Sequence, residues 1–231
     1  MGPTYSTRRQ QVEAYFDRTA ADAWARLTSD APVSRIRATV RAGRERMRAT
    51  LLDWLPADLH GRHILDAGCG TGAFALEAAR RGADVLAIDL SPTLVNIARE
   101  RVSQFSGPGR IEFRSGDMLD PSLGYFDHVV AMDSLIHYRA ADAVDALARL
   151  APHCSRSILF TFAPRTLPLA LMHRAGTLFP RGDRAPSIEP VSESHLRDLL
   201  GSASLAAWRI QRCERIASGF YTSQAMELVW Q

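Results

Sequence analysis

The sequence predicts an α/β fold in which a mostly parallel sheet carries helices on both faces. Three observations favour this fold. Short apolar runs alternate with helical patterns from about residue 63 onward. The first apolar run ends in an acidic residue and a glycine-rich turn. The chain of 231 residues is also long enough to bury a sizeable core, and alternating elements of this kind form a parallel sheet between layers of helix.

Two amphipathic helices are expected before the first strand. Apolar residues recur in steps of four and three within residues 8–28 and again from 36 to 55, where Pro56 ends the pattern. We therefore divide the chain into N-terminal helices, residues 1–58, and a core, residues 59–231.

The elements of the core then follow in order. The seven expected strands comprise residues 63–66, 83–88, 111–114, 126–132, 157–162, 207–213 and 225–230. The expected helices comprise residues 74–80, 91–104, 141–150 and 192–200. Gly82 is placed to end the first of these helices, Ser91-Pro92 to open the second, and Ser192 to open the last.

Residues 163–191 interrupt this alternation. They contain five prolines and an apolar centre, and connections this long are usually functional or disordered. We interpret the segment as a lid over the active site, with a surface insertion that has no catalytic role as the alternative.

The composition narrows the classes of function. The net charge is only +3, and arginines gather in the first fifty residues, either as a solvated helix face or as an attraction for anionic ligands or a lipid surface. Aromatic residues do not interleave with these arginines, so a nucleic-acid partner is not favoured. The three cysteines form neither a disulfide framework nor a zinc pattern, which fits a cytoplasmic protein, and no apolar run is long enough for a signal peptide or a membrane span. We expect at most peripheral membrane contact.

The glycine-rich turn points to a particular cofactor. Gly68, Gly70 and Gly72 have the spacing G-x-G-x-G, whereas dinucleotide sites have G-x-G-x-x-G. Glycines let a ligand lie close to the main chain. With Asp66 before the turn, the pattern favours S-adenosylmethionine (SAM) over a nicotinamide cofactor and argues against an oxidoreductase.

Acidic residues end four successive strands. Ligands of doubly wound sheets bind at the carboxyl ends of the strands, which is where Asp66, Asp89, Asp117 and Asp133 are expected. Asp66 suits the SAM ammonium, and Asp89 can accept hydrogen bonds from both ribose hydroxyls. Asp117 can accept from the adenine amino group, with Met118 against the ring. Asp89 as a helix cap is the alternative.

The SAM carboxylate needs a cation, for which Arg41 is the candidate. The set of residues expected around SAM is Arg41, Asp66, Ala67, Gly68, Gly70, Gly72, Asp89, Leu90, Asp117, Met118 and Asp133. A protein that binds SAM without turnover is an alternative that these carboxylates disfavour.

Residues 60–162 resemble the class I SAM-dependent methyltransferases, which implies a Rossmann-like, seven-stranded sheet. The stretches Met132–Tyr138 and Phe160–Thr166, with Leu178-Phe179-Pro180, resemble the magnesium protoporphyrin IX O-methyltransferase family of (bacterio)chlorophyll synthesis. That resemblance implies methylation of a porphyrin propionate, N-terminal helices that cover the active site, and contact with magnesium chelatase. Thr28 and the polar stretch Arg181–Pro186 depart from the family pattern.

His137 is the candidate catalytic residue, since it follows the fourth strand where the acceptor would lie. It can orient the propionate or ligate the porphyrin magnesium, and a structural role bonded to the backbone is the alternative. The residues expected to bind the substrate are Tyr15, Trp24, Tyr138, Arg165, Met172, His173 and Phe179, and no protein metal site is expected. The alternative function is methylation of a quinone or other small aromatic acceptor, with His137 as the base.

Overall fold

The computed structural model describes residues 5–18, 28, 32, 34–165, 188–201 and 203–231. Its helices are α1 (Tyr5–Arg18), α3 (Arg35–Trp54), α4 (Ala73–Arg80), α5 (Pro92–Val102), α6 (Ala140–Leu150) and α8 (Glu193–Leu200). Its strands are β1 (His63–Ala67), β2 (Asp84–Asp89), β3 (Arg110–Ser115), β4 (Phe126–Ala131), β5 (Cys154–Phe162), β6 (Trp208–Ser218) and β7 (Tyr221–Trp230).

The seven strands form one sheet in the order β3-β2-β1-β4-β5-β7-β6. Strands β1 to β5 are parallel to one another, and β7 runs antiparallel between β5 and β6. This arrangement confirms the predicted fold. The chain order reverses between β1 and β4, so the carboxyl ends of these two strands mark the place where such sheets bind ligands.

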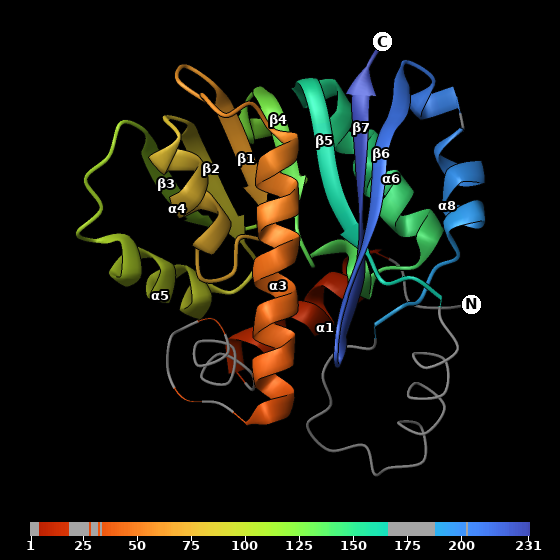
Figure 1. Cartoon of the computed structure of the whole chain (residues 1–231). Coiled ribbons are helices and arrows are strands. Elements are labelled where there is room, and N and C mark those ends of the chain that lie inside the picture. The colour runs from red at the N-terminus through yellow and green to blue at the C-terminus, as the bar shows by residue number, and fades with distance from the viewer. Residues whose placement is uncertain (1–4, 19–27, 29–31, 33, 166–187, 202) are drawn as a thin grey trace.

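Helices cover both faces of the sheet (Figure 1). One face packs against α3, α4 and α5 through a core that includes Met47, Ala78 and Val95, all completely buried. The opposite face packs against α6 and α8 through a second core, which includes Leu147 and Leu196. The strands that separate the two cores are therefore apolar on both faces, which explains their continuous apolar runs.

The helix boundaries agree with the local signals in the sequence. Ser91 is the N-cap of α5, where its side chain accepts a hydrogen bond from the Leu94 amide, and Ser192 caps α8 through the His195 amide. These bonds satisfy amides that have no partner within the helix. Because Ser91 is the cap, Asp89 is left for another role.

The hairpin of β6 and β7 is longer than the sequence predicts. The predicted strands, residues 207–213 and 225–230, leave residues 214–224 out of the sheet. In the structure the hairpin continues past the sheet to meet α3, where the Phe220 amide donates to Thr39 Oγ1 at 3.4 Å. The contact with α3 therefore supplies packing that the local pattern does not reveal.

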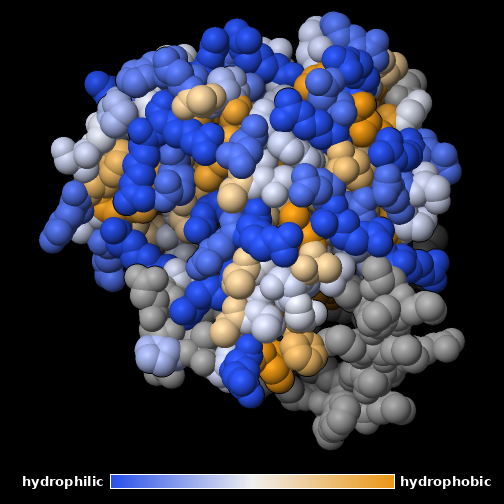
Figure 2. Space-filling view, viewed as in Figure 1, coloured by the Kyte–Doolittle hydropathy of each residue, from blue (hydrophilic) through white to orange (hydrophobic). Residues whose placement is uncertain are grey.

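Some predictions concern residues outside the described part of the chain. Trp24, Met172, His173 and Phe179 lie there, as does most of the expected lid, and the division at residue 58 stays a prediction. None of the described helices has the length and apolar character needed to cross a bilayer. Figure 2 shows hydrophilic side chains over much of the face that carries α3, with smaller hydrophobic areas between them.

Gly43 lets α3 approach β7 closely. A Cβ atom at residue 43 would lie 2.5 Å from Cδ1 of the Tyr221 ring. We expect Gly43→Ala to lower the free energy of unfolding by about 1–3 kcal/mol through overpacking, although alanine favours helix. Urea denaturation measures the change. The matched control is Ala42→Ser at the exposed neighbouring position, and a Gly43→Ala protein as stable as the wild type would contradict the packing argument.

Candidate active site

A cavity lies at the carboxyl ends of the parallel strands, between β1 and β4. It brings together most of the predicted cofactor residues, the candidate catalytic residue and one predicted substrate residue. Those that line it are Arg41, Asp66, Gly68, Gly70, Asp89, Leu90, Asp117, Met118, Asp133, His137 and Tyr138. The sequence thus places the cofactor and acceptor candidates around one space.

Of the predicted residues that the structure describes, four do not line this cavity. Ala67 is completely buried in β1, and Gly72 caps the start of α4. Tyr15 lies on α1 but contacts the Phe16 ring instead, with their centroids 5.2 Å apart. Arg165 lines a separate groove. Their assigned contacts with cofactor or substrate stay predictions.

The glycines of the turn serve the protein's own packing as well as the cavity. Gly68 has φ 87° and Gly72 has φ 79°, a region that other residues rarely adopt. An added Cβ would lie 2.4 Å from Ser134 Cβ at residue 68 and 2.9 Å from the Phe113 ring at residue 72. The turn therefore needs glycine at these two positions before any ligand is considered.

A buried carboxylate, Asp66, and a half-buried one, Asp89, form the centre of the site. Asp66 is only 2% exposed, and burial, together with the nearby charge of Asp89, raises its pKa to about 7. Burial also raises the pKa of Asp89, although backbone amides of Ser91 and Gly70 act in the opposite direction. Both carboxylates are thus costly to ionise without a cation nearby.

The hydrogen bonds of these two carboxylates show which of their oxygen lone pairs can still accept from a ligand. The Gly70 amide donates to Asp89 Oδ2 at 2.8 Å and the Ser91 amide donates to Oδ1 at 2.9 Å, which leaves further lone pairs on both oxygens. Within the described part of the chain, Asp66 Oδ2 and Ser134 Oγ are buried and have no hydrogen-bond partner. Buried polar atoms of this kind normally have partners. A ligand with an ammonium and hydroxyl groups, such as SAM, fits this donor and acceptor set.

Asp117 has contacts on both sides. Its Oδ1 accepts from the Leu119 amide at 2.9 Å, and its Oδ2 accepts from Arg9 of α1 at 3.0 Å. The arginine therefore lies next to the position that we assign to adenine. Met118 beside it is 9% exposed and lines the cavity.

Helix α1 lies across this end of the sheet and is held at several points (Figure 1). Arg8 pairs with Glu189 at 2.6 Å. At the other end of the helix, Asp17 Oδ1 accepts from the Thr93 hydroxyl at 2.8 Å and from the Thr93 amide at 3.2 Å. A carboxylate is favourable there because Thr93 belongs to the first turn of α5.

His137 lies in the short 3₁₀ helix Leu135–His137 that follows β4. Its side chain is mostly buried, it lines the cavity, and its ring packs edge-on against Phe16 of α1 with centroids 5.8 Å apart. The residue is therefore enclosed between the cavity and the covering helix, where it can contact an acceptor.

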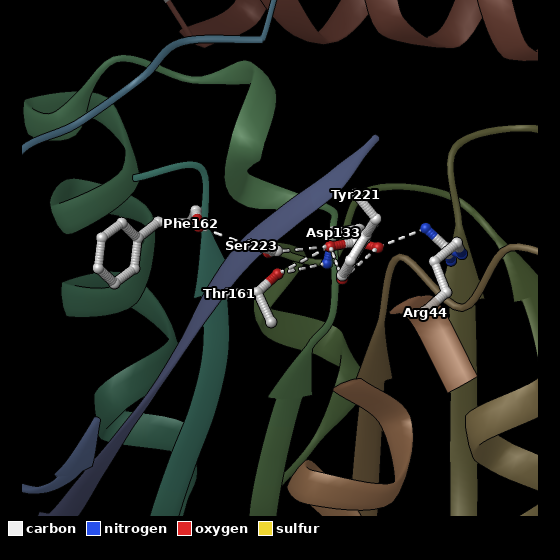
Figure 3. A network of polar contacts seen from close by, with 6 residues as sticks. All are labelled: Arg44, Asp133, Thr161, Phe162, Tyr221 and Ser223. Carbon is white, nitrogen blue, oxygen red and sulfur yellow. Dashed lines mark hydrogen bonds and ion pairs between the residues drawn. The ribbon is translucent and has the colours of Figure 1, made fainter. Parts of the chain in front are cut away.

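Asp133 is the centre of a polar network, so its carboxylate is already engaged by groups of the protein (Figure 3). Its carboxylate is 5% exposed and pairs with Arg44 of α3. It also accepts from Tyr221 of β7 at 3.2 Å and from Thr161 of β5 at 3.2 Å, while its own amide donates to Thr161 Oγ1 at 2.7 Å. Because Asp133 also has φ 55°, this network holds a strained residue at the cavity wall.

The sequence reasoning missed two further cations of the cavity wall. Arg44 and Arg48 line the cavity with Arg41. Their spacing from Arg41 is a signal in the sequence, because residues at i, i+3 and i+7 share one face of a helix. Several other arginines occur nearby, however, and the spacing alone does not single out Arg44 and Arg48.

Comparison of the chain with known protein families agrees with this geometry. Residues 64–156 match a family model described as "Methyltransferase domain". The sheet order and the cavity at its switch point thus define a SAM-dependent methyltransferase of class I.

The particular family follows from the whole chain. Residues 131–230 match the model "Magnesium-protoporphyrin IX methyltransferase C-terminus". The chain is 47% identical over 228 residues to magnesium-protoporphyrin O-methyltransferase of Rhodobacter capsulatus, which covers 98% of this chain and 99% of that protein. The chain therefore belongs to the magnesium-protoporphyrin O-methyltransferase family.

A solved structure supports the same family. The crystal structure of magnesium protoporphyrin IX methyltransferase from Synechocystis with bound SAH has a TM-score of 0.85 and 29% identity, covering 96% of this chain and 100% of that one. A ubiquinone biosynthesis O-methyltransferase of Xanthomonas oryzae pv. oryzae is 34% identical over 167 residues, but this covers only 68% of this chain and 65% of that protein.

The pKa of Asp66 predicts how SAM binding depends on pH. Its carboxyl is protonated well below its pKa of about 7, and only the ionised form attracts the SAM ammonium. We expect the affinity to rise as pH increases toward 7, by up to about tenfold per unit, while the ammonium stays charged below about pH 8. Calorimetric titrations across this range measure it.

Asp66→Asn is the control for this pH dependence. We expect it to bind SAM weakly with nearly the same affinity at each pH. The free wild-type protein should also lose stability relative to this variant as pH rises from about 4 to about 7, because the unfolded carboxyl releases its proton first. Wild-type affinity that does not change with pH would show that Asp66 does not hold the ammonium.

The Asp133 network predicts a loss of stability. Asp133→Asn leaves Arg44 at the cavity wall without its buried counter-charge, so we expect a loss of about 3 kcal/mol in the free energy of unfolding. Tyr221→Phe removes one hydrogen bond from the same carboxylate and should cost only about 1 kcal/mol. Denaturant titrations compare the two, and equal losses would show that the ion pair is not the dominant contact.

Proposed function

We propose that this protein transfers the methyl group of SAM to a propionate carboxylate of magnesium protoporphyrin IX. The observation that carries the proposal is that His137 lines the same cavity as Asp66 and Asp89. The cofactor carboxylates and the acceptor-side histidine thus face one space. Family membership over nearly the whole chain identifies the acceptor.

The reaction requires little from the protein in acid–base chemistry. A propionate is ionised at neutral pH, so one of its oxygens attacks the methyl carbon while the carbon–sulfur bond breaks and its electrons stay on sulfur. The products are a methyl ester and S-adenosylhomocysteine, and the positive charge of the sulfonium and the negative charge of the carboxylate are both lost. Alignment and removal of water from the carboxylate supply the rate enhancement.

The described residues suit these two tasks. Asp66 and Asp89 would hold the ammonium and the ribose of SAM, and Asp117 with Met118 would hold adenine. Phe16 and Tyr138 contribute apolar surface near His137 and limit the access of water. His137 would donate a hydrogen bond that orients the propionate, and no step needs it as a base.

The quinone alternative needs different chemistry. A phenol is mostly protonated at neutral pH, so His137 would have to remove its proton. The ubiquinone-type relative matches only part of this chain. Transfer of the porphyrin from magnesium chelatase, peripheral membrane contact and a cytoplasmic location stay predictions.

The decisive experiment mixes purified protein, SAM and magnesium protoporphyrin IX and looks for the monomethyl ester by mass spectrometry. We expect His137→Ala to lower kcat on the order of a hundredfold through lost alignment, while the SAM dissociation constant stays within about twofold. His153→Ala is the matched control, because that histidine lies outside the cavity. Absence of the ester, or faster methylation of a catechol, would overturn the proposal.

A further inference from the structure

A second groove lies beside the active site, on the side of α6 and α8. Its wall includes Arg139, Arg165, Glu189, Ser192 and His195, and we refer to it as the Arg165 groove. Nothing in the mechanism above uses it. The question is what chemistry this groove can bind.

The backbone beneath Arg165 is held firmly. The Arg165 amide donates to the Val191 carbonyl at 2.9 Å, and the Val191 amide donates to the Ala163 carbonyl at 2.9 Å. Pro164 and Val191 thereby form a parallel bridge that continues the end of β5. Arg165 therefore extends from an ordered backbone, so a ligand has to order only its side chain.

The charges around the groove leave an excess of positive charge. Glu189 is compensated by Arg8 at 2.6 Å. Arg139 binds Asp142 through Nε at 2.8 Å and Nη2 at 3.1 Å, so its Nη1 donors remain for another acceptor. Within the described part of the chain, the exposed Arg165 guanidinium makes no ion pair. An anion is the complementary ligand, and a carboxylate matches the planar fork of arginine.

The groove and the active-site cavity share one wall. His137 and Tyr138 line the cavity, whereas Arg139, the next residue, lines the groove. Tyr138 is extended, with φ −104° and ψ 149°, so the Cα atoms of residues 137 and 139 are about 7 Å apart. The Glu189 amide also donates to the Ile136 carbonyl at 2.9 Å and ties the rim of the groove to this wall.

We propose that the Arg165 groove binds the second carboxylate of the substrate, the propionate that is not methylated. This inference rests on the function proposed above. The substrate carries two propionates on neighbouring pyrrole rings, and a carboxylate removed from water needs a cation or donors. Arg165 and Arg139 would hold the spectator carboxylate while the reactive one lies beside His137. The groove would thus decide which arm reaches the sulfonium.

The test compares two porphyrins that differ only in the spectator arm. One is magnesium protoporphyrin IX, and the other is its monomethyl ester with the spectator propionate blocked and the reactive propionate free. Binding is measured by quenching of porphyrin fluorescence, and turnover by mass spectrometry. We expect the wild type to bind the diacid about tenfold more tightly, because the ester cannot pair with Arg165.

Variants of Arg165 give the decisive comparison. Arg165→Gln should weaken diacid binding about tenfold, leave ester binding and the KM for SAM unchanged, and so abolish the preference. Arg165→Lys should retain part of it, and Arg110→Gln, at an exposed arginine at the start of β3, should retain all of it.

The outcomes separate the two proposals. An unchanged preference for the diacid in Arg165→Gln would overturn the assignment of the groove, whatever the turnover. A preference that depends on Arg165, in a protein that forms no ester, would support the groove and overturn the proposed reaction.

Discussion

The parallel sheet gathers carboxylates at one edge, and the site depends on how each is compensated. Four aspartates line the cavity formed by the carboxyl ends of β1 to β4. Buried like charges raise each other's pKa and destabilise the fold unless each has a partner. The structure supplies these partners in different ways, and the differences separate binding residues from structural ones.

Asp133 and Asp117 are compensated by arginines of the N-terminal helices, Arg44 and Arg9. Asp89 is compensated by backbone amides. Asp66 has little compensation, and its pKa is raised to about 7. Among the described residues, Asp66 is thus the least compensated of these carboxylates, which makes it the one best suited to the cation of the cofactor. Ionisation of this carboxyl lowers the stability of the free protein, and the ammonium of the cofactor restores that stability when it binds.

The fold could be predicted from the sequence because its signals are local. Apolar runs, serine caps such as Ser91, and the glycine turn each depend on a few neighbouring residues. The far end of the β6–β7 hairpin could not be predicted, since it forms against α3 through Thr39, about 180 residues away along the chain.

The site shows the same division. The acids at the strand ends were predictable because strand ends in a parallel sheet converge. The partners of Asp133 were not, since Arg44 and Tyr221 come from elements far apart in sequence and neither has a motif of its own. A motif therefore identified Asp133 as part of the cavity, whereas only the tertiary contacts show that four other side chains already engage it.

The covering helix α1 makes the cofactor and acceptor sides interdependent. Arg9 meets Asp117 on the adenine side, Phe16 meets His137 on the acceptor side, and Arg8 meets Glu189 at the rim of the Arg165 groove. One helix of fourteen residues thus contacts all three parts. A helix that packs on both sides at once is positioned best when each side is formed, which links enclosure of the methyl donor to enclosure of the acceptor. Such a link would favour methyl transfer over hydrolysis, because water is excluded where the carboxylate and the sulfonium meet.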